Sequence, residues 1–402
     1  MVWIFIWDTA PSKIYVWWSE VASVRAGDTK VRPTYKPRTF TISRTEQQNM
    51  SSWWTYSDDA AWLTAWDTAF DEFFWYSAVL LDANWNEIEE VTQSSPWVLN
   101  MWSFNWALTG TANNVMIKFP RRWIKMSKSW SVVTLSITEE PNKDGYQYYA
   151  HTKGTAAKNN LYLWAYEWTF TQNNSTVSAY SAWKTYLKSW ATKSYLQNRS
   201  PAGYRTIAEF RATAAKNWNW YSLMTWYPRQ YINALYMMKY GNPDSTSVIW
   251  KWYSSSSSRW AAPWATNTYT SATYGNTSSN DVMKLFWLEN IYGNSSEKLD
   301  WCFLNNSKQL TVDKTNNIFQ SSDYNTNLWT AVWRYMWWIV GTNDGMFYNV
   351  TNAGSASYYY KSMYNLSSWY DSVIVSNTGS GWIFYTNVWD DYSNIWARLM
   401  YL

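Results

Sequence analysis

Apolar and polar residues alternate over several short stretches between residues 39 and 139. A period of two places every second side chain on the same face of an extended chain, so this pattern predicts β-strands with one face in a core. Residues typical of turns lie between the stretches. The predicted strands are Thr39–Ile42, Ser77–Leu81, Glu87–Val91, Val115–Phe119 and Val132–Ile137.

The first 38 residues form a separate pattern of very short apolar stretches. Lys13–Val16, Glu20-Val21 with Val24, and Lys30–Pro33 read as short strands, and Gly27-Asp28 supplies a turn before the last of them. A link that contains Pro33 and Pro37 follows. This part of the sequence therefore predicts a small β module that is joined to the rest by a short linker.

Apolar residues recur every three or four positions in two later stretches, residues 202–217 and residues 230–240. This spacing predicts two helices, and Gly241-Asn242-Pro243 ends the second one. The remaining residues of the second half read as short strands and long polar loops. The predicted fold class is α+β, with a β attachment module (1–38), a β-rich domain (39–139) and a third domain (140–402).

Tryptophan stands in positions where glycine is the residue that a turn requires. The chain has 36 Trp and 13 Gly, although glycine ordinarily supplies roughly 7% of a protein. Trp85 and Trp130 lie in turn sequences, and Trp260 and Trp264 lie in a loop of small residues. A bulky side chain is strained at positive φ, where glycine is not. We infer that most of these tryptophans are UGA codons that the source organism reads as glycine.

The alternative is a tryptophan-rich carbohydrate binder. Such binders place a few aromatic rings on one face, whereas here the indoles occur in many turns. Trp54, Trp106, Trp226 and Trp389 have aromatic or apolar neighbours and read as true tryptophans.

Charge, cysteine and histidine content exclude several classes of function. The net charge is +4 with no basic stripe, so nucleic acid is not an expected partner. One cysteine, Cys302, excludes an intrachain disulfide, and one histidine, His151, excludes a multi-histidine metal centre. No apolar run is long enough for a membrane span, and no signal peptide is evident, which indicates synthesis in a cytoplasm.

With Trp read as Gly, residues 283–300 resemble the formylglycine-generating-enzyme-like branch of the C-type lectin fold. The resemblance rests on the turn Gly293-Asn294, followed by Glu297 and Asp300, although Lys298 stands where the family has an aromatic residue. Residues 393–399, which include Arg398, resemble the closing strand of that fold. The resemblance implies that residues 140–402 are a C-type-lectin-like domain and that these motif residues are structural.

Other segments resemble phage tail and tail-fibre proteins that end in this fold, namely residues 148–151, 161–168 and 249–253. The last hundred residues resemble the variable region of proteins diversified by retroelements. That resemblance implies a ligand-binding surface made of Tyr358, Tyr360, Tyr364, Asn377, Thr378, Asn387, Trp389, Asp390, Asp391 and Tyr392. Tyrosine and asparagine suit such a surface, although tyrosines that alternate along a strand also pack into cores.

Possible catalytic and metal-binding residues have simpler structural interpretations. A lone His151 is more often structural, and Cys302 lacks the partner cysteines of the formylglycine enzymes. The acidic pairs at 58–59, 89–90, 139–140 and 390–391 suit solvated turns better than a glycosidase site. Residues 82–86 open like a calcium loop, but Gln93 stands where that loop needs glutamate.

These observations predict a non-enzymatic receptor-binding protein of a phage or prophage tail, without a cofactor or metal. Its expected partners are a host-cell surface protein or glycan and other virion proteins, and the sequence is compatible with a homotrimer. The alternatives are a cell-encoded surface adhesin of the same fold, a formylglycine-type enzyme, and a polysaccharide-degrading enzyme.

Overall fold

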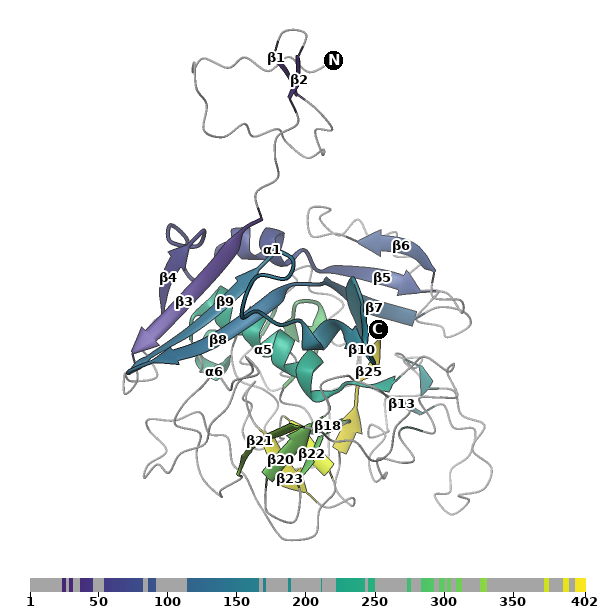
Figure 1. Cartoon of the computed structure of the whole chain (residues 1–402). Coiled ribbons are helices and arrows are strands. Elements are labelled where there is room, and N and C mark those ends of the chain that lie inside the picture. Colours follow the sequence, from purple (N-terminus) through teal and green to yellow (C-terminus); the bar gives the residue numbers. More distant parts are fainter. Residues whose placement is uncertain are drawn as a thin grey trace, which may run out of the picture. The chain divides into compact units, whose positions relative to one another are not determined.

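The computed structural model describes residues 24–26, 29–31, 37–45, 54–81, 86–91, 114–165, 169–170, 187–188, 211, 222–242, 245–249, 273–275, 283–292, 296–300, 302–304, 309–312, 326–330, 372–375, 386–389 and 395–402 (Figure 1). The chain divides into two compact units, residues 1–37 and residues 38–402. In the first unit, β1 (Val24–Ala26) and β2 (Thr29–Val31) form an antiparallel pair in which Ala26 lies opposite Thr29. The expected turn at Gly27-Asp28 joins these strands and lies outside the described residues.

A four-stranded antiparallel sheet opens the second unit. Its strands, in spatial order, are β4 (Thr55–Asp58), β3 (Thr39–Thr45), β9 (Val132–Thr138) and β8 (Trp123–Ser129). Alternate residues of β3 and β9, such as Phe40, Ile42 and Leu135, are buried in the core. The predicted strands at 39–42 and 132–137 are confirmed, because their period of two matches a sheet with one covered face.

A second antiparallel sheet joins distant parts of the chain. Its order is β15 (Ser222–Leu223), β25 (Leu399–Tyr401), β12 (Asn160–Trp164), β7 (Asn114–Pro120), β5 (Ser77–Leu81) and β6 (Glu87–Val91). The predictions for β5, β6 and β7 are confirmed. The expected division at residue 139 does not coincide with a break between sheets, since strands from both sides of it hydrogen-bond within this sheet.

Helix α5 (Trp226–Tyr240) is buried along its whole length and contacts α1 (Ala69–Phe74), the 3-10 helix η1 (Tyr149–His151) and β3. It ends where expected, because Gly241 adopts a left-handed conformation with φ 57° and its N–H bonds the carbonyl of Met237. It begins four residues before the expected start at 230. Pro228 is tolerated there because the first-turn N–H groups have no acceptor within the helix.

Of the other expected helix, 202–217, the structure describes Arg211 alone, which is helical. A further short helix, α6 (Ser245–Val248), follows α5. In the described part of the chain, no helix combines the length and apolarity needed to cross a membrane.

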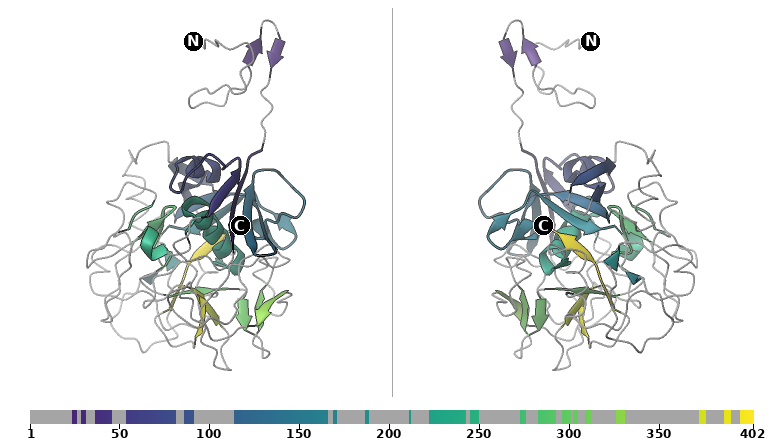
Figure 2. Two further views of the ribbon diagram at one scale, coloured as in Figure 1. Left: turned by 90° about the vertical axis from the view of Figure 1, so that its left-hand side faces the viewer. Right: turned by 90° about the vertical axis from the view of Figure 1, so that its right-hand side faces the viewer.

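Short strands make up the rest of the second unit (Figure 2). Hairpins are formed by β10 (Thr152–Lys153) with β11 (Ala156–Ala157), β13 (Thr169–Phe170) with β14 (Leu187–Lys188), and β16 (Lys284–Leu285) with β17 (Leu288–Glu289). One sheet has the order β19 (Cys302–Leu304), β20 (Gln309–Val312), β21 (Thr326–Thr330). Another has the order β23 (Thr386–Trp389), β22 (Ser372–Val375), β18 (Ser296–Leu299), β24 (Ile395–Ala397). The fold is thus mixed and rich in strands, with few helices.

The described tryptophans include two contrasting groups. Trp66, Trp75 and Trp130 have positive φ, of 77°, 54° and 54°, and all three are exposed. Trp130 occupies the turn between β8 and β9 and is 95% exposed, so the turn conformation expected at this position is confirmed. Trp123 and Trp226 are buried and do not adopt positive φ. The backbone favours glycine in the first group and accommodates an aromatic residue in the second.

We therefore predict UGA codons at positions 66, 75 and 130 and UGG codons at positions 123 and 226. Trp130→Gly should raise the free energy of unfolding by about 1 kcal/mol, because it relieves a left-handed conformation and loses almost no buried area. Trp123→Gly should lower it by about 3 kcal/mol or more through loss of a buried ring. Reading the gene and measuring urea denaturation of both variants tests this, and UGG at position 130 would contradict it.

Candidate functional site

A buried carboxylate, Glu297 of β18, lies between two buried arginines. Arg398 connects β24 to β25 and donates its Nε to Glu297 Oε1 at 2.9 Å, while its Nη2 lies 2.8 Å from the same oxygen. Arg229 of α5 approaches Glu297 Oε2 at 3.5 Å. All three side chains are at most 2% exposed. The three residues come from parts of the chain that are far apart in sequence, so this cluster ties those parts together.

The arginines also satisfy backbone carbonyls at the same place. Arg398 donates to the carbonyl oxygens of Trp164 and Glu289, each at 2.7 Å, and Arg229 donates to that of Ile291 at 2.5 Å. Buried carbonyls without such donors would cost free energy, because no water reaches them. The cluster therefore holds the segment 283–292 against β12 and α5.

Asp300 forms a second ion pair beside the first. Arg211 donates to it through Nε and Nη2 at 2.5–3.0 Å, and the Asp300 side chain is 3% exposed. The backbone of Asp300 bridges Thr225, directly before α5, and its N–H donates to the carbonyl of Met224 at 2.9 Å. Met224 in turn donates its N–H to the carbonyl of Arg398 at 2.6 Å. The start of α5 thus lies between the two ion pairs.

The structure brings together three of the five residues expected to form a structural motif. Glu297 and Arg398 contact each other, and Asp300 directly follows β18, the strand that carries Glu297. Gly293 and Asn294 lie outside the described residues. Sequence reasoning missed the third member of the cluster, Arg229, because helical spacing does not reveal that this arginine is buried beside Glu297.

Of the residues expected to bind a ligand, Asn387 and Trp389 lie in β23. Asn387 pairs with Ile374 and Trp389 pairs with Ser372 of β22, and β23 is the outermost strand of its sheet among the strands described. The others lie outside the described residues: Tyr358, Tyr360, Tyr364, Asn377, Thr378, Asp390, Asp391 and Tyr392.

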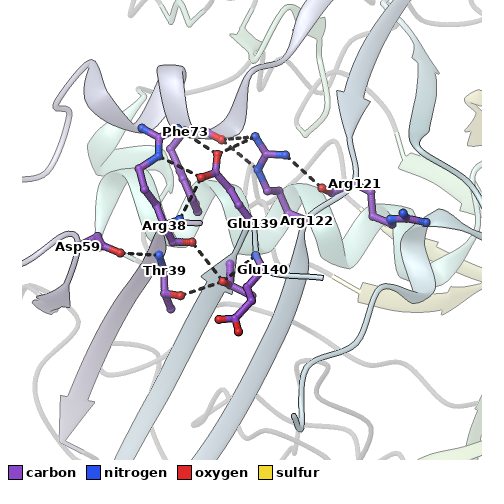
Figure 3. Close-up of polar contacts among 9 residues, drawn as sticks. Arg38, Thr39, Asp59, Phe73, Arg121, Arg122, Glu139 and Glu140 are labelled. Carbon is purple, nitrogen blue, oxygen red and sulfur yellow. Dashed lines mark hydrogen bonds and ion pairs between the residues drawn. The ribbon is translucent and has the colours of Figure 1, made fainter. Parts of the chain in front are cut away.

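The acidic pair Glu139-Glu140 corrects one expectation. Glu139 is 7% exposed rather than solvated, and its carboxylate accepts hydrogen bonds from Arg38 at 3.0 and 3.1 Å and from Arg122 at 3.3 Å (Figure 3). Arg122 also donates to the carbonyl of Phe73. Arg38 directly precedes β3 and Arg122 directly precedes β8. By binding both arginines, Glu139 joins these two strands at one end of the first sheet. In the pair at 58–59, Asp58 accepts from the Thr41 hydroxyl and Asp59 from the Thr39 N–H.

The two side chains considered for catalysis are both buried. Burial raises the pKa of the Cys302 thiol well above its usual value, so Cys302 is a poor nucleophile, and its expected packing as a small buried residue is confirmed. The His151 ring packs edge-on against Tyr231 and donates Nε2 to the carbonyl of Phe119 at 3.2 Å. Within the described ranges, no three side chains of His, Cys, Asp or Glu are grouped closely enough to hold a metal ion.

No model of a known protein family matches the chain, and no curated protein matches it either.

The buried ion pair makes a prediction about stability. Arg398→Met leaves Glu297 buried with a weaker partner and should lower the free energy of unfolding by about 3–5 kcal/mol. Lys143→Met is the control, because the pair of Lys143 with Glu140 is exposed and should contribute about 1 kcal/mol or less. Urea denaturation of both variants measures the difference, and equal losses would contradict a special role for Glu297.

His151 makes a prediction about pH. Burial, helped by the nearby charges of Arg121 and Arg122, lowers the pKa of His151 from 6.5 to about 3. Between these values the unfolded chain binds a proton that the folded chain does not, so stability falls as pH falls below 6.5. The slope is about 1.4 kcal/mol per pH unit. Because His151 is the chain's one histidine, its imidazole NMR signal should not titrate between pH 5 and 8.

The control is His151→Gln, which removes the ionisable group. As the pH falls from 6.5 to 5, the free energy of unfolding should decrease in both proteins. The decrease should be smaller in His151→Gln, by about 2 kcal/mol. An imidazole signal that titrates near pH 6.5 would show that the ring is accessible to protons and would overturn the assignment.

Proposed function

We propose that the chain is a non-enzymatic receptor-binding protein of a phage or prophage tail, with a C-type-lectin-like domain in its second half. The observation that carries the proposal is the contact between Glu297 and Arg398. The sequence resemblance marks both residues as structural, one after the Gly-Asn turn and the other in the closing strand, and they share a buried ion pair across 101 residues.

The division that the sequence predicts, between a scaffold and long polar loops, supports a binding role. Buried ion pairs and helix α5 hold the scaffold, while the segment before β24 carries the polar and aromatic residues of the proposed surface. Loops on a fixed scaffold tolerate sequence change without unfolding the protein. Trp389 and Tyr392 flank the acidic pair Asp390-Asp391. They combine large, rigid side chains with neighbouring charge, as ligand-contacting surfaces often do.

Burial of His151 and Cys302 supports a binding protein over the enzyme alternatives, because neither side chain can reach a substrate. A cell-encoded adhesin of the same fold would use the same surface. The neighbouring genes distinguish it from a virion protein, since tail genes beside this one would favour the virion.

Trp389→Ala and Tyr392→Ala should each weaken binding to host cells or to their purified surface glycan by about 2 kcal/mol, which is about 30-fold, because buried aromatic anchors carry much of a binding surface's affinity. Trp130→Ala is the matched control, since its indole is exposed on the hairpin between β8 and β9. Circular dichroism checks folding. Unchanged affinity in both variants, with ligand protection at residues 40–138 instead, would move the receptor site to the first sheet.

A further inference from the structure

Cationic and aromatic side chains share one face along β8 and the segment opposite it. Ile124 and Met126 are buried in the core, so the alternation of a strand places Lys125 on the opposite face, as it does Trp123. Ile124 pairs with Gln147 through two backbone hydrogen bonds, of 2.8 and 2.9 Å. This bridge sets the tyrosines on either side of Gln147 beside β8.

The pairing of Ile124 with Gln147 brings cationic side chains near aromatic rings. The Arg121 guanidinium carbon lies 5.0 Å from the Trp123 ring centroid and 5.6 Å from that of Tyr148. The ammonium of Lys125 lies 5.7 Å from the Tyr146 ring centroid. The rings of Trp123 and Tyr148 meet edge to face. Aromatic rings therefore fix the positions of two cations, Arg121 and Lys125, which we call the basic stripe.

Neither cation of the stripe is neutralised by an acidic group within the described residues. The guanidinium of Arg121 has no hydrogen bond or ion pair there, and its Nε is a buried donor without an acceptor. The ammonium of Lys125 has no ion pair there either. Lys143, which also lies over Tyr146, is paired with Glu140 at 3.1 Å and adds little net charge.

The adjacent arginines have opposite environments. Arg122 binds Glu139 and the carbonyl of Phe73, whereas Arg121 points away from that cluster (Figure 3). The two Nη groups of Arg121 are not among the buried donors of the described residues, so a binding partner that brings an acceptor can reach them. Arginine is also the side chain best suited to a carboxylate or phosphate.

Positive charge is concentrated in the surrounding segment. Residues 114–165 contain eight lysines and arginines and three acidic residues, which gives +5, whereas the whole chain has a net charge of +4. The basic residues are spaced along strands and turns rather than in a run. The sequence therefore showed no basic stripe, and the fold brings one together.

We propose that the basic stripe binds an acidic polysaccharide through its carboxylate or phosphate groups. This second surface is independent of the receptor site proposed at residues 358–392. Arg121 and Lys125 are four residues apart, about 13 Å along an extended chain. A polymer that carries an anionic group on many of its units can meet both cations at once.

The ring faces disfavour nucleic acid. Binding of single strands relies on bases that stack on free aromatic faces. Here Arg121 covers Trp123 and Tyr148, while two lysines cover Tyr146. The rings thus serve to hold the cations, and the cations are the groups offered to a ligand.

The test measures binding of the full chain to immobilised polygalacturonate, phosphomannan, a single-stranded oligothymidylate and neutral dextran. We expect binding to polygalacturonate or phosphomannan that weakens as salt rises, because exposed charges are screened. Preference for one of these two identifies carboxylate or phosphate as the bound group. Arg121→Gln should reduce the affinity for the polymer about tenfold, and Lys125→Gln should reduce it less. Arg121→Lys should retain part of the affinity that Arg121→Gln loses.

Lys118→Gln is the charge-matched control, because Lys118 is already paired with Glu87 and Glu90 at 3.0 and 2.6 Å. It should leave polymer binding unchanged, as should Trp389→Ala, which separates this surface from the receptor site. Thermal unfolding checks that each variant folds. The proposal fails if neither acidic polymer binds, if Arg121→Gln and Lys125→Gln bind as the unmodified chain does, or if oligothymidylate binds at least as tightly.

Discussion

The burial of Glu297 is the constraint on which the second half of the structure depends. A carboxylate at 2% exposure is tolerated only when cations and hydrogen bonds replace the lost water, and Arg398 and Arg229 supply them. One arginine comes from the chain's last strands and the other from the central helix. The C-terminal strand β25 can then enter the sheet between β12 and β15, which joins the first and last parts of residues 38–402.

Local patterns predicted local structure well. The strands at 77–81 and 87–91 and the end of α5 at Gly241 follow from alternation and from glycine's tolerance of positive φ. Long-range partners could not be predicted in this way. Arg398 and Glu297 are 101 residues apart, as are Arg38 and Glu139, and no spacing rule connects such pairs. Only the family resemblance pointed to Glu297 and Arg398, and nothing pointed to Arg229.

The same contrast between local and long-range requirements separates the two groups of tryptophans. A turn requirement is local, so the sequence alone indicated glycine at Trp130, where the backbone has φ 54°. Whether a tryptophan belongs to a core depends on residues far along the chain. Trp123 gave no signal in the sequence, yet its ring meets Tyr148 and supports Arg121. Positive φ thus marks Trp130 as a position that favours glycine, and packing marks Trp123 as one that accommodates an aromatic ring, whereas Trp287 combines φ 67° with burial.

Arg121 and Arg122 show how one fold separates structural from functional charge. Both follow β7 directly, and their neighbouring positions in an extended segment send the side chains in opposite directions. Arg122 meets Glu139, the carboxylate that closes the first sheet, and its charge is used within the fold. Arg121 meets two rings and no acidic group in the described residues, so its charge remains for an outside partner. The rings of Trp123 and Tyr148 hold the Arg121 guanidinium in place without neutralising its charge, and this is the condition that the proposed anionic partner requires.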